Sequence, residues 1–359
     1  MHAKSLLHHL VDAAADRDSG QIAVASGSIR STYGELQTAI AHFGAGLLGL
    51  GLARGERVAI YLDKRPEFIH AAFGTSRAGG VFVPINPILK AEQVGHILRD
   101  CNVRVVVTTV ERLATLRDTL AACHDLRHVV LIGAPAERPA VDGASVHLWD
   151  ELMTAPAAPG HRIIDSDMAA ILYTSGSTGR PKGVVLSHRN MMVGARSVAH
   201  YLGNHAEDVL LAALPLSFDA GLSQLTTAFQ AGARVVLLNY LLPRDVLKAI
   251  ERERVTGLTA VPPLWIQLAQ LEWPAHVTEH LRYIANTGGR MPLDTLNRLR
   301  AQLPQTKPFL MYGLTEAFRA TYLPPEQVDH RPDSIGKAIP DTEVLVLRED
   351  GSECAPNEP

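Results

Sequence analysis

Short apolar runs alternate with amphipathic helical patterns along most of the chain. Runs of mostly apolar, often β-branched residues occupy 57–62, 81–86 and 103–109, and each is followed by a stretch with helical periodicity. Strands that alternate with helices form βαβ units, whose strands pair in a mostly parallel sheet. The pattern therefore predicts an α/β fold.

The alternation is interrupted between residues 134 and 160. This segment is rich in Ala and Pro and lacks periodicity, which is typical of a linker or an irregular surface excursion. We expect two stacked, mostly parallel βαβ subdomains at about 1–160 and 161–335. The alternating run 343–347 and the turn-like sequence after it predict that 336–359 begins a small β-barrel subdomain.

Composition and charge narrow the classes of protein that fit the chain. Of its 359 residues, 47% are hydrophobic and 20% are charged, which suffices for a large core and argues against disorder. The net charge of −3 and the lack of a basic stripe argue against a nucleic-acid partner. Three cysteines without CxxC spacing, no signal peptide and no membrane-spanning apolar run predict a cytoplasmic protein that does not insert into membranes.

A loop rich in Ser, Thr and Gly follows the predicted strand 168–174. From Thr174 to Gly183 it reads TSGSTGRPKG. Ligands of open α/β sheets bind at the carboxyl ends of strands, and the backbone N–H groups of a Gly-rich turn can hold a polyphosphate beside a lysine such as Lys182. The spacing differs from that of a Walker loop, which needs GxxxxGK[ST] and a following helix. An ordinary turn between two strands is the alternative.

The loop resembles the signature of the adenylate-forming superfamily, which holds acyl-CoA synthetases, adenylation domains of nonribosomal peptide synthetases and beetle luciferases. Three later motifs support the resemblance. YGLTEA at 312–317 is similar to the second nucleotide motif, GGRMP at 288–292 to the Gly-rich adenine loop, and SIGKAIP at 334–340 to a GxxGxP-type turn. Segments 32–36 and 77–86 also fit, so the resemblance covers nearly the whole chain.

The resemblance implies a reaction in two halves. A carboxylic acid attacks the α-phosphate of ATP to give an acyl-adenylate and pyrophosphate, and a thiol of CoA or of carrier-bound phosphopantetheine then takes the acyl group. The implied catalytic residues are Lys182, Thr315, which would donate to the α-phosphate, and Glu316, which would bind Mg²⁺. Tyr312 would stack on adenine. The other implied nucleotide-binding residues are Thr174, Ser175, Gly176, Ser177, Thr178, Gly179, Gly288, Gly289, Arg290, Met311 and Gly313.

Each of these residues also has a purely structural interpretation. Without the motif, Tyr312 could be an ordinary core aromatic. Thr315 and Glu316 could be the N-cap and a first-turn acid of a helix. The ordered combination of motifs favours the functional interpretation.

The resemblance also indicates where the acid binds. Phe218 and Asp219 lie in the segment that lines the substrate pocket, and this pair resembles amino-acid-activating domains, where the Asp pairs with the substrate ammonium. Many fatty acyl-CoA synthetases differ here, often with His. Asp219 could instead be the N-cap of the helix that follows. Motif alignment places four more residues near the pocket: Asn286, Thr287, Met311 and Arg319.

Arg319 is unusual among the mostly apolar linings of such pockets. It could meet a second carboxylate of the substrate, or it could be a surface arginine whose stem lies on apolar neighbours. The second interpretation is the one we expect from the sequence. An amino acid or another amine-bearing acid is nevertheless a serious candidate for the substrate.

Two parts of the family's machinery have no counterpart after Pro340. These are the TGD-type motif with its ribose-binding Asp, and the hinge with the small C-terminal lid domain. We therefore expect residues 1–359 to be a truncated N-terminal domain. The function we predict is that of an AMP-forming acid–thiol ligase of acyl-CoA synthetase type, which uses ATP, Mg²⁺ and CoA. The alternatives are an amino-acid-activating domain that loads a carrier protein and a nucleotide-binding scaffold that does not turn over.

Overall fold

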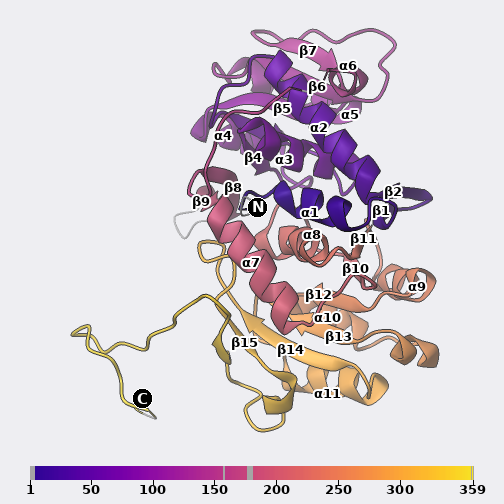
Figure 1. Cartoon of the computed structure of the whole chain (residues 1–359), viewed down its shortest axis with the longest axis vertical. Coiled ribbons are helices and arrows are strands. Elements are labelled where there is room, and N and C mark those ends of the chain that lie inside the picture. The colour runs from indigo at the N-terminus through magenta and orange to yellow at the C-terminus, as the bar shows by residue number, and fades with distance from the viewer. Residues whose placement is uncertain (1–4, 157, 176–180, 357, 359) are drawn as a thin grey trace.

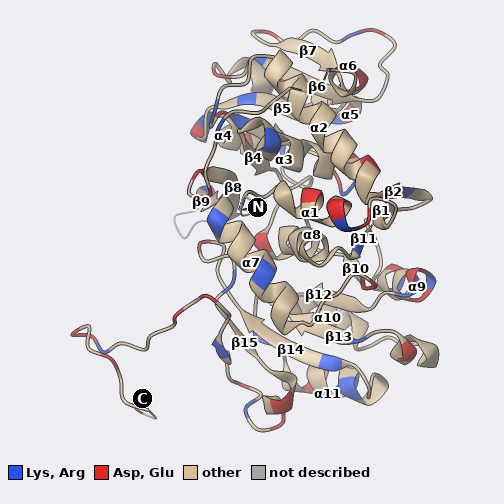
Figure 2. Cartoon of the chain, in the orientation of Figure 1, with Lys and Arg blue, Asp and Glu red and all other residues tan. Residues whose placement is uncertain are grey.

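Two stacked β-sheets with helices packed on them form the molecule (Figure 1). The computed structural model describes residues 5–156, 158–175, 181–356 and 358. Most strands in both sheets pair in parallel, which confirms the predicted α/β fold class. Figure 2 shows Lys and Arg interspersed with Asp and Glu over both halves of the molecule.

The first sheet has seven strands among the described residues, in the order β7-β6-β5-β3-β4-β8-β9. Only the hairpin of β8 and β9 is antiparallel among the pairs of this described sheet. Its strands are β3 (Arg57–Ile60), β4 (Val81–Pro84), β5 (Val103–Thr109), β6 (His128–Ile132), β7 (Ser145–Leu148), β8 (Met168–Ser175) and β9 (Pro181–Ser187). Its connecting helices are α3 (Pro66–Ala78), α4 (Ala91–Asp100), α5 (Val110–Ala121) and α6 (Trp149–Met153).

The second sheet has nine strands in the described chain, in the order β16-β15-β14-β13-β12-β10-β11-β1-β2. Antiparallel pairs join β2 to β1 at one edge and β15 and β16 to β14 at the other. The strands are β1 (Ile22–Ser26), β2 (Ile29–Thr32), β10 (Val209–Ala212), β11 (Arg234–Leu237), β12 (Gly257–Ala260), β13 (Tyr283–Asn286), β14 (Lys307–Tyr312), β15 (Thr321–Leu323) and β16 (Lys337–Ala338). Its helices are α9 (Pro243–Glu253), α10 (Pro262–Leu268), α11 (Leu293–Gln302) and the 3₁₀ turns η1 (Ala275–Glu279) and η2 (Pro325–Gln327).

Four helices join the two sheets into one body: α1 (His9–Arg17), α2 (Tyr33–Gly49), α7 (His188–Tyr201) and α8 (Asp219–Ala231). One apolar cluster runs from the first sheet through these helices to the second sheet. A capping box opens α2, since the Glu35 N–H donates to Thr32 Oγ1 over 3.2 Å and Glu35 Oε2 accepts the Thr32 N–H at 2.8 Å. No described helix is both long and apolar enough to cross a membrane.

The sheets do not divide at residue 160, where the sequence predicts a boundary. Strand β1 pairs in parallel with β11, and Val24 lies opposite Val235, so the N-terminal hairpin belongs to the second sheet. Strands β8 and β9 belong to the first sheet. Burial accounts for this placement, because the apolar residues Ala23, Val24 and Ala25 are almost fully enclosed in a strand that pairs with both β2 and β11.

Two further segments differ from the sequence-based expectation. The predicted linker 134–160 contains β7 and α6, so only part of it is irregular. Residues 343–346 do not form a strand, and antiparallel pairing beyond β16 is limited, in the described segment, to one bridge between Leu347 and Glu353. A hairpin of this length is marginal by itself. A β subdomain beginning at 336 stays a prediction.

Candidate functional site

The two predicted nucleotide motifs line one cavity of about 490 Å³. It lies at the carboxyl ends of β13 and β14, which pair in parallel with Asn286 opposite Leu310, so the loops after both strands meet at one edge of the sheet. Seven predicted residues line it: Asn286, Gly288, Gly289, Arg290, Met311, Tyr312 and Gly313. The other lining residues are Met291, Leu310, Leu314, Pro332, Asp333, Ser334 and Ile335.

One side-chain hydrogen bond and a glycine shape the loop after β13. The Asn286 side-chain amide donates to the Gly289 carbonyl over 2.7 Å, and Gly288 has φ +73°, a conformation that favours glycine. Arg290 forms an ion pair with Asp333 across the cavity rim. The hydrogen bond and the ion pair therefore fix the backbone and polar groups that line this side of the cavity.

Tyr312 is half-exposed at the end of β14, on the wall of the same cavity. A tyrosine with 42% of its surface exposed is not the core aromatic of the structural alternative. Its ring offers a flat apolar face, which a planar ligand such as a nucleobase can stack on.

Thr315 and Glu316 lie in a turn after β14. Residues 313–320 are all described and form turns and extended segments, so the interpretation of these two residues as a helix N-cap and first-turn acid is wrong. Thr315 Oγ1 lies 3.4 Å from Asp219 Oδ1. The Glu316 side chain is exposed. An exposed carboxylate can bind a hard cation such as Mg²⁺ together with phosphate oxygens.

The Ser/Thr/Gly loop joins two antiparallel strands, and Thr174 lies opposite Lys182 in the ladder of β8 and β9. The Lys182 side chain is exposed. Ser175 ends β8, and its side chain is not among the described groups. The predicted residues Gly176, Ser177, Thr178 and Gly179 lie outside the described residues.

Asp219 and Arg319 form an ion pair at the start of α8. Arg319 Nη1 donates to Asp219 Oδ2 and to the Phe318 carbonyl, both over 2.7 Å. The Arg319 side chain is 1% exposed and that of Asp219 is 18% exposed. The interpretation of Arg319 as a surface arginine is therefore wrong. Phe218 is the N-cap of α8 and Asp219 its first residue, so the N-cap interpretation of Asp219 is wrong as well.

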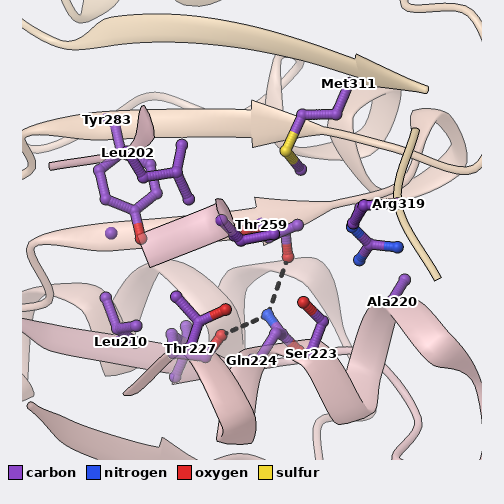
Figure 3. Close-up of a pocket in the computed structure, with 13 residues that line it drawn as sticks. Leu202, Leu210, Ala220, Ser223, Gln224, Thr227, Thr259, Tyr283, Met311 and Arg319 are labelled. Atoms are coloured by element: carbon purple, nitrogen blue, oxygen red, sulfur yellow. Dashed lines mark hydrogen bonds between the residues drawn. The ribbon is translucent and has the colours of Figure 1, made fainter. Parts of the chain in front are cut away.

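A small enclosed cavity of about 10 Å³, room for about one water molecule, lies against Arg319 (Figure 3). Nε and Nη2 of Arg319 are buried and have no hydrogen-bond partner among the described groups, and the same holds for Thr227 Oγ1. The figure shows the Arg319 side chain reaching toward Ala220 and Ser223 of α8. The full lining is Val198, Leu202, Leu210, Leu211, Ala220, Ser223, Gln224, Thr227, Gly257, Thr259, Tyr283, Met311 and Arg319.

Two polar lining residues of this cavity, Ser223 and Thr227, are absent from the predicted site. Together with Asp219 they follow one another at intervals of four, which puts them on one face of α8. The spacing of four between these polar residues, which continues from Asp219, is the signal that could have identified them. The predicted residues Asn286 and Thr287 are buried at the end of β13.

In the part of the chain that the structure describes, one other group of potential metal ligands lies at the start of α1. Ligand atoms of His8, His9 and Asp12 lie within 4.8 Å of one another. The Asp12 carboxylate already accepts from Arg77 at 2.9 Å and from Gln37 at 2.8 Å. Because Arg77 already pairs with the only carboxylate of this group, the group is a poor site for a divalent cation.

Comparisons with known proteins agree with this geometry. Residues 11–359 match the sequence profile of the family described as AMP-binding enzyme. The chain is 31% identical to the L-proline–[L-prolyl-carrier protein] ligase of Streptomyces coelicolor over 88% of this chain and 59% of that protein. It is 33% identical to the feruloyl-CoA synthase of an Amycolatopsis species over 82% of this chain and 56% of that protein. The chain thus spans less than two thirds of the length of either relative.

Solved structures show the same fold. The structure of VinN in complex with L-aspartate superimposes with a TM-score of 0.83 at 28% identity, covering 98% of this chain and 86% of that chain. The sequence motifs, the cavity that they line and these similarities lead to one conclusion. The chain belongs to the family of AMP-binding enzymes.

Proposed function

We propose that the protein activates an amine-bearing dicarboxylic acid of about the size of aspartate, forming an acyl-adenylate and pyrophosphate from ATP. The observation that carries the substrate class is the ion pair of Asp219 and Arg319, in which Arg319 lines a small cavity and keeps two nitrogens without a partner among the described groups. Membership of the AMP-binding family supports the adenylation half of the proposal.

The adenosine part of ATP would bind in the cavity between the loops after β13 and β14. Tyr312 offers an exposed ring to the base, and the backbone of 288–290 lines the same cavity. ATP brings an activated α-phosphate with pyrophosphate as the leaving group. Thr174 and Lys182, which face each other across β8 and β9, would bind the β- and γ-phosphates.

Thr315 and Glu316 would act at the α-phosphate. The Thr315 hydroxyl would donate to an α-phosphate oxygen, and the exposed Glu316 carboxylate fits a Mg²⁺ ion shared with the phosphates. When bound, Mg²⁺ neutralises phosphate charge. The contribution of the protein is to hold the attacking carboxylate and the phosphate in line, which removes most of the entropic cost of their encounter.

The acid would bind between α8 and the turn that carries Arg319. Its ammonium would face Asp219, and the carboxylate that is not activated would accept from Nε and Nη2 of Arg319, which have no partner among the described groups. Satisfying these buried donors lowers the free energy of the complex. Met311 lines both this cavity and the nucleotide cavity, so the acid would lie next to the nucleotide.

Two observations support a short polar acid over a fatty acid. Arg319 and Asp219 place a buried guanidinium and a partly exposed carboxylate at the start of α8, and a fatty acyl chain carries no charge that could pair with either of them. VinN, whose fold this chain shares, has been solved in complex with L-aspartate.

The acceptor of the acyl group would be a thiol. The resemblance in sequence favours CoA, and feruloyl-CoA synthase is a relative of that kind. A pocket that suits an amino acid supports carrier-bound phosphopantetheine instead, as in the ligase that loads proline onto a carrier protein. We therefore propose a carrier protein as the acceptor and keep CoA as the alternative. A nucleotide-binding scaffold that does not turn over is the alternative of another class.

ATP–pyrophosphate exchange with a panel of acids tests the proposal. L-aspartate is compared with L-alanine and β-alanine, which each lack one carboxylate, with succinate, which lacks the ammonium, and with octanoate. We expect L-aspartate to support exchange at least tenfold faster than the other four acids. Fastest exchange with octanoate would contradict the substrate class, and calorimetric binding of ATP without exchange for any carboxylic acid would favour the scaffold.

A further inference from the structure

The chain makes a strained turn one residue before Arg319. Phe318 has φ +61°, and the Arg319 N–H donates to the Ala317 carbonyl over 2.7 Å, which closes a three-residue γ-turn. A γ-turn with positive φ at its centre is rare and strained, and a bulky aromatic residue in this region of φ is an outlier. Such strain persists only when the surrounding structure imposes it, and it is frequent at functional sites.

The surroundings of Phe318 show what imposes the turn. Its ring is fully buried and packs on Gly194 of α7. A Cβ atom added to Gly194 would lie 2.3 Å from Phe318 Cδ1, so the ring occupies the space that any other residue at 194 would need. Glycine is a poor helix former, and its presence in the middle of α7 has a clear packing reason in this contact.

The turn determines where the Arg319 side chain lies. The carbonyl of Phe318 accepts from Arg319 Nη1 at 2.7 Å, on the same nitrogen that donates to Asp219. This leaves Nε and Nη2 of Arg319 free to face the cavity beside α8. Behind the turn the backbone is packed closely, because a Cβ on Gly313 would lie 3.1 Å from Arg319 Cα.

We infer that Phe318 and Gly194 are positioning residues for substrate specificity. The ring of Phe318, packed on Gly194, holds the strained turn that aims Arg319 at the second carboxylate of the acid. This inference rests on the proposed function, since it assumes that Arg319 binds that carboxylate. Neither Phe318 nor Gly194 lines the cavity beside Arg319, so both act through the arginine.

Two variants of Phe318 separate the effect of the backbone conformation at this residue from the effect of its ring. Phe318→Gly and Phe318→Ala both remove the ring, but only glycine adopts φ +61° without strain. The measured quantity is the ratio of the dissociation constants of L-alanine or β-alanine, whichever binds better, to that of L-aspartate. Because both constants come from the same protein sample, a reduced folded fraction cancels in the ratio.

We expect Phe318→Ala to lower the ratio at least tenfold and Phe318→Gly to lower it less, since both variants lose the ring but only glycine adopts φ +61° without strain. A purely structural role lowers the stability of these variants but leaves the ratio at its wild-type value, because the ratio compares two ligands on the same folded protein. Gly194→Ala supplies an independent variant, which should lower the ratio at least tenfold with ATP affinity changed less than twofold. Wild-type ratios in both Phe318→Ala and Gly194→Ala would overturn the inference.

Arg319→Ala distinguishes failure of this inference from failure of the proposed function. If Arg319→Ala keeps the wild-type ratio, Arg319 does not bind the second carboxylate and the proposed substrate class is wrong. If Arg319→Ala removes the preference for L-aspartate while Phe318→Ala and Gly194→Ala keep the wild-type ratio of dissociation constants, only the positioning role is wrong.

Discussion

The Arg319 guanidinium lies 2.7 Å from the Asp219 carboxylate, and the two residues are separated by 100 positions in the chain. Arg319 is almost fully buried, whereas Asp219 keeps 18% of its side chain exposed. The pair is therefore asymmetric. Removal of the acid leaves a buried cation without its counter-charge, and removal of the arginine leaves a carboxylate that still meets solvent.

This asymmetry predicts unequal effects on stability. Asp219→Ala should lower the free energy of unfolding by about 3 kcal/mol, because an unpaired buried charge is left behind. Arg319→Met, which keeps an apolar side chain of similar length, should cost clearly less. Urea unfolding of both variants followed by circular dichroism checks the prediction. A larger loss in Arg319→Met than in Asp219→Ala would contradict it.

We expect the Tyr312 ring to contribute to nucleotide binding by stacking on the base. Tyr312→Ala should weaken the binding of AMP and of ATP alike, by about tenfold, because a base stacked on an aromatic ring contributes about 1–3 kcal/mol. Tyr312→Phe keeps the ring and should bind both nucleotides like the wild type. Calorimetric titration gives the affinities. Unchanged AMP affinity in Tyr312→Ala would show that the base binds elsewhere.

For Lys182 we expect the affinities for AMP and ATP to change by different factors. If its ammonium binds the β- and γ-phosphates, Lys182→Ala should weaken ATP binding about tenfold and leave AMP binding within twofold, since AMP lacks those phosphates. Lys182→Arg keeps the charge and serves as the matched control. An equal loss for AMP and ATP in Lys182→Ala would contradict this role.

The sequence predicts which residues line the cavity after β13 and β14 better than it predicts the surroundings of Arg319, for a physical reason. Tyr312 and Gly288 lie in short motifs at the ends of adjacent parallel strands, so local sequence and strand order together bring them to one cavity. The burial of Arg319 depends on an acid 100 residues away, and no local pattern shows this. The apolar pattern likewise predicts β1 as a strand but does not show that β11 is its partner.

Buried histidines predict a loss of stability in weak acid. Burial lowers the pKa of His188 from 6.5 to about 4, and its Nδ1 accepts the Leu7 N–H at 3.1 Å. Between pH 6.5 and 4 the unfolded chain binds a proton that the folded protein does not. The free energy of unfolding should therefore fall as the pH falls through this window, by up to about 1.4 kcal/mol per pH unit for this group.

His188→Asn provides the test, because the asparagine side-chain oxygen can accept the same Leu7 N–H. The variant should lose less stability than the wild type between pH 6.5 and 4. Urea unfolding at half-unit steps of pH measures the two slopes. Burial also lowers the pKa of His70 to about 4, so part of the slope should persist in the variant. Parallel slopes in both proteins would contradict the assignment to His188.

We propose that this AMP-binding enzyme adenylates a short amino dicarboxylic acid that Asp219 and Arg319 bind. The most direct measurement is mass spectrometry of the adenylates formed from ATP, Mg²⁺ and an equimolar mixture of L-aspartate, L-alanine, β-alanine, succinate and octanoate. The account predicts that aspartyl-adenylate dominates and that this preference disappears in Arg319→Ala. A dominant octanoyl-adenylate, or an aspartate preference that persists in Arg319→Ala, would contradict it.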